Sequence, residues 1–348
     1  MDPSRLRPHL GPHLGGRLWS AFGGRSSRRR RALQAVLAAA SALALLLWWL
    51  LPSDGPSYPR APVSFATGVA NGVYETYGVL LKNDLRTALP GVRVNLMQTE
   101  GSVDNIKRLV AGDADFTIAA SDAVADYQGP GRKDLRACAR LYDDYVQLVV
   151  PQNSPVRSAR DLRGLRVGVG QAGSGVILIA RRLLMAAGLD IDKDIDPFPV
   201  GIDQAPAMLA GGRLDAFFWS GGLPTAPVTK LSTTMGIRLV QLGDLVPRLH
   251  TMGRKMQYYR QAVMPADAYP SAQDGRAVAT VAVANLLVTT DRADTGLVER
   301  LTRAVIDSRD VIGKRVHAAQ LVDLRTAVFT DPLPLHGGAA RYYRSVKP

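Results

Sequence analysis

The sequence predicts an α/β protein of two lobes, each built on a mainly parallel sheet covered by helices, with one transmembrane helix ahead of them. Three observations lead to this fold class. A unit of strand, small polar turn and helix recurs five times after residue 62. Two extended stretches are suited to connect the lobes. The chain has 348 residues, 47% hydrophobic and 21% charged, which suits a globular protein of two lobes or one large domain.

The N-terminal segment predicts a membrane anchor. Residues 1–31 contain eight arginines and one acidic residue, and they lead directly into Ala32 to Leu51, which carries no charge. Twenty helical residues span about 30 Å, the thickness of a bilayer core. The positive-inside rule makes 1–31 a cytoplasmic tail, and two tryptophans suit the opposite interface. We expect a single-pass membrane protein, with 32–51 as signal anchor, 52–62 as a proline-rich linker, and the main domain in the extracytoplasmic space.

A cleaved signal peptide is the alternative to the anchor. A signal peptide needs a short apolar core followed by a small-x-small cleavage site. Here the apolar run is long, and Pro56 directly follows Gly55, where cleavage would fall. The paired arginines are also compatible with twin-arginine export. A buried core helix is a poorer interpretation, because such a helix rarely starts behind four arginines.

The first lobe is predicted from three strand–turn–helix units. Each strand is a short apolar run, each turn is rich in small and polar residues, and Pro90-Gly91 ends the first helix. Ser102 suits the start of the second helix, because its hydroxyl can accept a backbone N–H there. The strands and helices expected are 63–67 with 73–89, 92–97 with 102–110, and 116–120 with a helix toward Tyr127.

The second lobe is predicted from two further units and two crossings. The extended stretches 141–152 and 258–265 are expected to carry the chain out of the first lobe and back. The lobes would then be residues 63–147 plus 262–348, and residues 148–261. The elements expected are a strand at 165–169 with a helix ending near 187, a strand at 216–219, a strand at 280–288 and helices within 295–319.

A ligand site is expected where the polar turns follow the strands. In parallel α/β sheets ligands bind at the carboxyl ends of strands, and each turn that opens a helix exposes free backbone N–H groups at the positive end of the helix dipole. Such a cleft suits an anion or carboxylate. An aromatic ring could stack on the ligand, and Asp122 could receive an ammonium group or cap its helix. The candidate ligand-binding residues are Thr67, Gly68, Asn71, Tyr74, Glu100, Ser102, Ser121, Asp122, Gly173, Ser174, Gly175, Phe218, Trp219 and Gly221.

The glycine turn raises a rival, enzymatic interpretation. Gly168 to Gly173 matches G-x-G-x-x-G between a strand and a helix, which is the context of a dinucleotide fingerprint in a nucleotide-dependent oxidoreductase. The acid that should end the next strand is missing, since the aspartates at the right distance lie in a polar loop. Soluble NAD is also scarce beyond a membrane anchor. Ser174 is not in a G-x-S-x-G elbow. We therefore expect an anion-binding turn and no enzyme.

Composition disfavours several other functions. The single cysteine, Cys138, excludes an internal disulfide framework, and five scattered histidines make a zinc site improbable. The net charge of +13 comes largely from the N-terminal tail, and the rest shows no basic cluster with interleaved aromatics. We expect no cofactor, no metal and no nucleic-acid partner.

A series of short motifs runs through the domain from about Val63 to the C-terminus. The opening motif is Thr67-Gly68-x3-Gly72-x-Tyr74-x3-Gly78. It is followed by Gly101–Asn105, Gly112–Asp115, Ser121-Asp122, Asp161–Val167, Gly173–Gly175, Asp215–Phe218, Val278–Val283 and Pro334–Tyr343. Their order resembles the TAXI family (TRAP-associated extracytoplasmic immunogenic proteins), the solute receptors of tripartite ATP-independent periplasmic transporters.

The resemblance implies a two-lobed, type II-like periplasmic-binding fold with a two-strand hinge. Such a receptor closes on a small-molecule solute, an organic acid or an amino acid such as glutamate, and docks on membrane subunits of the TRAP permease. This chain departs from the pattern at Val69, where a second glycine is usual, and at Ala119-Ala120, which lack the usual glutamine. Glu100 stands where a small residue is common, and a buried carboxylate disfavours an anionic ligand. Either the ligand differs from glutamate, or Glu100 points to solvent, or the chain is a non-binding tethered relative with a sensing or assembly role.

Overall fold

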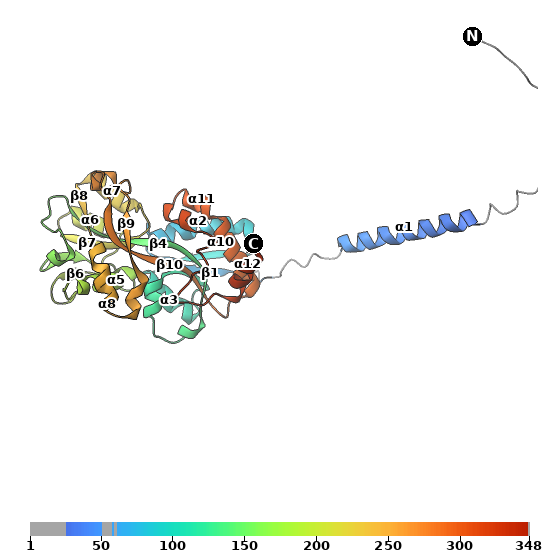
Figure 1. Ribbon diagram of the computed structural model, residues 1–348, viewed down its shortest axis with the longest axis horizontal. Helices are drawn as coiled ribbons and strands as arrows, with labels where there is room; N and C mark the ends of the chain where they lie inside the picture. Colours follow the sequence, from blue (N-terminus) through green and yellow to red (C-terminus); the bar gives the residue numbers. More distant parts are fainter. Residues whose placement is uncertain (1–25, 51–57, 59–60, 347–348) are drawn as a thin grey trace, which may run out of the picture. The chain divides into compact units, whose positions relative to one another are not determined.

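The computed structural model describes residues 26–50, 58 and 61–346. The chain divides into two units, residues 1–57 and residues 58–348. The first unit contains helix α1 (Ser26–Leu50), and the second is the folded domain (Figure 1). The two units are described separately below.

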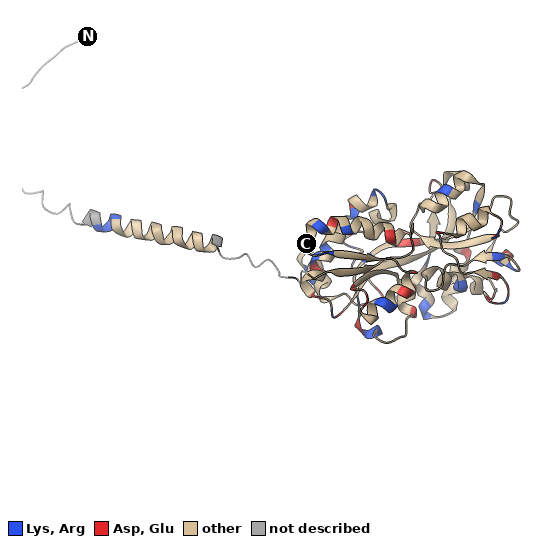
Figure 2. Cartoon of the chain, turned by 180° about the vertical axis from the view of Figure 1, so that it is seen from behind, with Lys and Arg blue, Asp and Glu red and all other residues tan. Residues whose placement is uncertain are grey.

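Helix α1 has the length and composition of a membrane-spanning segment. Its stretch Arg29–Trp48 has a mean hydropathy of 1.7, and none of it is buried. Charged residues stand only at the start of the helix, and the remaining turns carry none (Figure 2). The lack of burial argues against a soluble core helix, whereas an anchor and a signal sequence both fit. Residues 1–25 of the predicted tail, the last residue of the anchor 32–51, and residues 52–57, 59 and 60 of the linker lie outside the described residues.

The folded domain is built on one mixed sheet of ten strands in the order β2-β1-β3-β10-β4-β7-β5-β6, with β8 paired to β4 and β9 to β10. Strands β2, β1 and β3 are parallel to one another, as are β7, β5 and β6, whereas β4 and β10 run antiparallel to their neighbours. The strands are β1 (Val63–Ala66), β2 (Val94–Met97), β3 (Phe116–Ala120), β4 (Leu135–Pro151), β5 (Arg166–Gly168), β6 (Asp196–Phe198), β7 (Ala216–Gly221), β8 (Ile237–Val240), β9 (Tyr259–Met264) and β10 (Val278–Thr290).

Helices follow most of the parallel strands, so the predicted alternation of strand and helix is confirmed. The α-helices of the domain are α2 (Val73–Ala88), α3 (Ser102–Ala111), α4 (Ser121–Asp126), α5 (Gly175–Ala186), α6 (Ala205–Ala210), α7 (Ala226–Thr234), α8 (Val246–Thr251), α9 (Pro270–Gln273), α10 (Thr295–Asp307), α11 (Arg309–Gly313) and α12 (Gly337–Val346). Short 3-10 turns are η1 (Arg132–Asp134), η2 (Ala159–Leu162), η3 (Gly243–Leu245), η4 (Arg254–Tyr258) and η5 (His317–Leu321).

Two large hydrophobic cores lie at the two halves of the sheet. The first core packs β1, β3, α2, α10 and α12 around Phe65, Tyr77 and Phe116. The second core packs α5, β5, β7 and β8 around Leu183, Phe217 and Ile237. β3 is buried along its whole length, and its residues are apolar except for Thr117. This is expected for a strand covered on both faces. Each core supports its own set of strand ends and turns.

Strands β4 and β10 contribute to both cores and cross between the two halves of the domain (Figure 1). In β4, Tyr142 packs in the first core and Val146 in the second. In β10, Val283 packs in the second core and Leu287 in the first. The chain therefore passes from one core to the other within the stretch 141–152, and β4 begins earlier, at Leu135.

The second crossing differs from the prediction. The stretch 258–265 is β9, which pairs only with β10 and places Tyr259 and Met264 in the second core. The chain returns along β10, the apolar strand that was expected to follow the crossing. Both stretches are extended, but 258–265 contains Arg260 and Gln261 whereas β10 is mostly apolar. The strand pairing and the core contacts identify β10 as the strand that returns to the first half. The limits of the two lobes remain a prediction.

Candidate functional site

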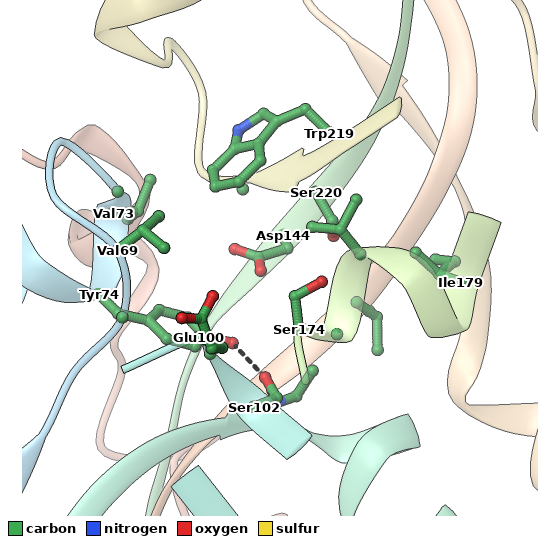
Figure 3. A pocket seen from close by; sticks show the side chains of 18 of the residues that line it. Val69, Val73, Tyr74, Glu100, Ser102, Asp144, Ser174, Ile179, Trp219 and Ser220 are labelled. Atoms are coloured by element: carbon green, nitrogen blue, oxygen red, sulfur yellow. Dashed lines mark hydrogen bonds between the residues drawn. The ribbon is translucent and has the colours of Figure 1, made fainter. Parts of the chain in front are cut away.

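A cavity of about 50 Å³ lies at the carboxyl ends of strands from both halves of the sheet (Figure 3). Its wall includes the turn after β1, the start of α3, the end of β3, the start of α5 and the end of β7. The middle of β4 contributes Asp144 and β10 contributes Val283. The cavity therefore stands where the sequence places the ligand site, with walls from elements of both cores.

Nine of the predicted site residues line this cavity. They come from four of the five predicted turns or helix starts and from the end of β7. These residues are Gly68, Tyr74, Glu100, Ser102, Asp122, Ser174, Gly175, Trp219 and Gly221. That they contact a ligand remains a prediction.

Five predicted residues are not part of the wall. Thr67 and Ser121 are buried beneath it, and the Thr67 hydroxyl donates to the Met97 carbonyl at 3.1 Å. Phe218 packs in the second core, because successive side chains of β7 point to opposite faces and Trp219 takes the cavity side. Asn71 lines two other pockets. Gly173 lies against Glu100, behind the cavity rim.

Tyr74 and Ser102 are fixed to one another at the floor of the cavity. The two hydroxyl oxygens are 3.1 Å apart (Figure 3), and the Ser102 hydroxyl also accepts the Ala120 N–H at 3.1 Å. The Tyr74 hydroxyl donates to Oδ1 of Asn285, which sits at an irregularity in the pairing of β10 with β4. Burial, and next the charge of Asp144, raise the pKa of Tyr74 well above its usual value. Tyr74 is therefore a neutral hydroxyl at all physiological pH values.

Asp144 is a cavity residue that the sequence analysis did not identify. It is 4% exposed, and Figure 3 shows its carboxyl group between Trp219 and Ser174. Burial is the main cause that raises its pKa to about 7; Asn285 lowers it, and Asp143 and Asp122 raise it further. Its Oδ1 atom has no hydrogen-bond partner among the described residues. A buried, unpaired carboxyl oxygen at a cavity wall is a position where a ligand can complete the hydrogen bonding.

Asp122 is held by a buried network beneath the same wall. Its Oδ2 accepts the Tyr259 hydroxyl at 2.6 Å and Nη1 of Arg182 at 3.4 Å. Arg182, which is 5% exposed, also donates to Tyr259 at 2.6 Å and to Asp126 at 2.8 Å. Burial raises the pKa of Asp122, although Arg182 and Tyr259 oppose that shift. The network joins α4 to α5 and leaves Oδ1 of Asp122 without a partner in the described structure.

The start of α5 presents backbone donors to the cavity. Ser174 caps the helix: its hydroxyl accepts the Ile177 N–H at 3.2 Å and donates to the Gln171 carbonyl at 2.7 Å. Gly175 and Val176 line the cavity in the first helical turn, where N–H groups lack intrahelical partners. This helix start therefore has the donor character that the sequence predicted for it.

Two hydrogen bonds close the cavity rim between elements of the two cores. The Asp104 N–H of α3 donates to the Gly173 carbonyl at 3.0 Å. The Gln171 side-chain amide donates to the Glu100 carbonyl at 3.1 Å. Gly173 has a φ of +87°, and a Cβ there would approach the Glu100 Cβ to 3.2 Å, so glycine permits this close contact. We name these four residues, Glu100, Asp104, Gln171 and Gly173, the rim latch.

The dinucleotide interpretation finds little support in the structure. Asp190, Asp192 and Asp194 stand where a ribose-binding acid would be expected. Each is committed to a neighbouring cation: Asp190 to Lys193 at 3.9 Å, Asp192 to Arg181 at 2.6 Å and Asp194 to Arg163. They lie on the loop before β6 rather than at the end of a strand. The glycines of the turn instead shape the helix start and the rim latch.

A sequence model described as the NMT1-like family matches residues 65–346. The chain belongs to the NMT1-like family. The match spans the folded domain from β1 to α12. The resemblance to TAXI receptors lies within the same residues, and its finer assignment is taken up below.

Solved structures of low sequence identity show the fold of this NMT1-like domain. The periplasmic binding protein BugD is 14% identical, covers 83% of this chain and 95% of its own, and has a TM-score of 0.54. A protein described as a periplasmic transporter is 15% identical, with 83% and 93% covered and a TM-score of 0.52. The aliphatic sulphonate-binding protein SsuA from Escherichia coli is 15% identical, with 84% of each chain covered and a TM-score of 0.43. The fold is the predicted α/β periplasmic-binding type.

The NMT1-like domain contains further wall residues that sequence reasoning missed. Val69, Val73 and Ile179 make the wall partly apolar, while Ser220 adds a polar group (Figure 3). Gln171 adds another. Val69 replaces a glycine of the resembling family, so its side chain fills space at the wall. Adjacency to the predicted turns could have identified these positions. Asp144 carried no such signal, because it sits within a strand rather than after one.

Proposed function

We propose that this NMT1-like protein is the extracytoplasmic solute receptor of a TRAP-type transporter and belongs to the TAXI group. In this proposal it binds an organic acid or amino acid in the cavity between two lobes, and it performs no catalysis. The α1 segment anchors it in the bacterial inner membrane, and the closed domain docks on the permease membrane subunits. The family membership and the periplasmic-binding fold support a solute receptor, and the motif series supports the TAXI group.

The cavity with its rim latch is the observation that carries this proposal. Its walls come from elements of both cores, and the latch hydrogen bonds join α3 to the turn before α5. Contacts of this kind exist only when the two halves are close together. A ligand that touches both halves favours the closed arrangement by its extra contacts there. In this proposal the structure is the closed state of a hinged receptor.

Strands β4 and β10 are suited to act as the hinge. They pair with each other along most of their length and carry residues of both cores. Asp144 and Val283 are register partners in this pair and line the cavity. A ligand at Asp144 would therefore sit directly on the hinge, where a small change in strand twist has the largest effect on the rim.

A thermal-shift screen of the dialysed full-length protein in detergent tests this proposal against its alternatives. The panel contains amino acids, amines, organic acids and NAD(H). A higher melting temperature with an amino or organic acid supports the receptor, since a ligand that binds only the folded state stabilises it. A response to NAD(H) alone would favour the oxidoreductase, and a flat screen would favour a non-binding relative with a sensing or assembly role.

A further inference from the structure

The cavity wall carries negative side chains and no positive one. Glu100, Asp122 and Asp144 line it, and no lysine, arginine or histidine is among the described residues of the wall. Glu100 is exposed at the rim, whereas the two aspartates are buried. A dicarboxylate placed here would meet like charges in a desolvated space, which disfavours its binding.

Asp144 offers a free acceptor in the middle of the wall. Its Oδ1 is buried and unpaired within the described part of the chain. The groups near it are Asp122 from α4, Tyr74 from α2, Asn285 from β10 and the buried hydroxyl of Tyr142 from β4 itself. Its strand neighbour Asp143 forms ion pairs with Arg140 and Arg260 and is not part of the wall. A donor on the ligand is the natural partner for this oxygen, because a buried carboxyl group without one is costly.

Asp122 provides a second unpaired acceptor oxygen. The nearby cation, Arg182, is already paired with other side chains. Arg182 donates to Asp122, Tyr259 and Asp126, and it does not line the cavity. Arg182 therefore cannot bind a ligand carboxylate in the cavity. Oδ1 of Asp122 remains buried and unpaired among the residues the structure describes.

The opposite wall tolerates, at most, one anionic group. The first turn of α5 presents the N–H groups of Gly175 and Val176 at the positive end of the helix dipole. This partial charge is equivalent to about half an elementary charge, so it does not balance the carboxylates across the cavity. A ligand with a cationic nitrogen satisfies both walls, either alone or as part of a zwitterion.

We propose that the ligand presents a protonated amine to Asp144 and Asp122, so that the solute is an amino acid or an amine and not a dicarboxylate. This inference rests on the proposed receptor function and narrows its substrate class. The cavity geometry and the unpaired oxygens carry it. Amino acids and amines share the ammonium group that the two aspartates would bind. Where the solute also has a carboxylate, that group faces the start of α5.

Binding of such a ligand is coupled to the protonation of Asp144. Without ligand its pKa lies at about 7, mainly through burial and secondarily through Asp143 and Asp122. An ammonium group favours the ionised carboxyl, so binding below about pH 7 releases a proton. Affinity should therefore increase as the pH rises from about 6 to about 8. A carboxylate ligand that accepts a hydrogen bond from protonated Asp144 would show the opposite trend.

Isothermal titration of the dialysed full-length protein in detergent tests the inference. The probes are L-alanine, L-lysine, putrescine and succinate, each at about pH 6 and about pH 8. We expect at least one amine probe to bind, more tightly at the higher pH, and succinate not to bind. Binding of alanine or lysine without putrescine identifies an amino-acid site, and binding of putrescine identifies an amine site. Either result supports the inference.

Two adjacent variants make the test specific. Asp144→Asn keeps the size of the side chain but removes its charge, and we expect about a tenfold or greater loss of amine affinity. Asp143→Asn removes a charge outside the wall that raises the pKa of Asp144, so it should move the pH dependence to lower pH and leave affinity at about pH 8 within about twofold. The pH dependence should disappear in Asp144→Asn alone. Circular dichroism confirms that both variants fold.

Two results would overturn the inference. Succinate binding to the parent protein, with no amine binding, would leave the receptor function standing and exclude the cationic ligand. Amine binding of equal affinity in Asp144→Asn would remove Asp144 from the site. If every probe fails and the thermal-shift screen is also flat, the receptor function itself fails.

Discussion

Arg182 and Asp122 illustrate how one buried pair links stability to the site. The Arg182 side chain is only 6% exposed and contacts Asp122, Asp126 and Tyr259. Its sequence neighbour Arg181 also forms an ion pair, with Asp192, but both partners are largely exposed. The adjacent positions thus place the same residue type in two different environments.

We predict that Arg182→Met lowers the free energy of unfolding by about 3–5 kcal/mol, because it leaves a buried carboxyl group uncompensated. Arg181→Met should cost about 1 kcal/mol or less, since exposed ion pairs are screened by water. Chemical denaturation of both variants measures the difference. Equal losses would contradict the structural role of the buried network.

Asp144 should make stability depend on pH. Its pKa rises from 3.8 to about 7 on folding, so the folded state binds a proton more tightly than the unfolded state between these values. By linkage, this group lowers stability as the pH rises from about 4 to about 7. We predict that Asp144→Asn is more stable than the parent at about pH 8, by a few kcal/mol, and that the gain shrinks toward pH 4. A pH-independent difference in melting temperature would count against this assignment.

The sequence could locate the turns of the site but not Asp144 or Arg182. Glycine and hydroxyl residues after apolar strands mark Ser102 and Ser174 by local pattern alone. Which of Asp143 and Asp144 faces the cavity depends on the strands paired with β4, and that pairing is a tertiary property. In the sequence, Arg182 cannot be distinguished from the adjacent Arg181 on the same helix. Only the packing of α5 against α4 buries Arg182.

At the level of elements, the turn before α5 and the start of α3 form the movable rim. Gly173 was predicted to contact the ligand, whereas the structure places it against Glu100 and Asp104 in the latch. Gly188 offers a matched control, because it has a similar φ of +82° with no atom near its Cβ position. Alanine at either position incurs the same left-handed backbone strain, about 1–2 kcal/mol.

We predict that Gly173→Ala weakens ligand affinity by about tenfold, since its methyl group opposes closure of the rim, while Gly188→Ala leaves affinity unchanged. Both should lose similar stability. Titration with the ligand found in the screen, alongside thermal melting, separates the two effects. Equal affinities for the two variants would mean that the latch does not control binding.

Element boundaries were predictable where periodicity and turn residues agree. Strands β1 and β3 and helices α2 and α5 follow the expected ranges closely, because each apolar run ends in a glycine, serine or proline signal. The return crossing was placed at 258–265, whereas that stretch is β9, which pairs with β10, and β10 continues into the first core. Arg260 and Gln261 make β9 more polar than β10, so the hydropathy of the two stretches already favours β10.

At the scale of the whole molecule, the location of the protein depends on α1. Its apolar stretch Arg29–Trp48 is long enough to cross a bilayer. We predict that the full chain stays in the membrane fraction after carbonate washing, because about twenty apolar residues hold it in the lipid. N-terminal sequencing is the companion measurement. A mature protein that starts near Tyr58 and washes free would identify the segment as a cleaved signal.

We infer that a small solute closes the two halves of the domain over Asp144. Hydrogen exchange of the full chain, followed by mass spectrometry with and without the ligand, tests this closure. We expect slower exchange at the Asp104 N–H and around Gly170 to Val176, where the latch and the start of α5 meet the ligand, and little change in α7. Ligand binding that leaves exchange at the latch and the α5 start unchanged would contradict closure over this site.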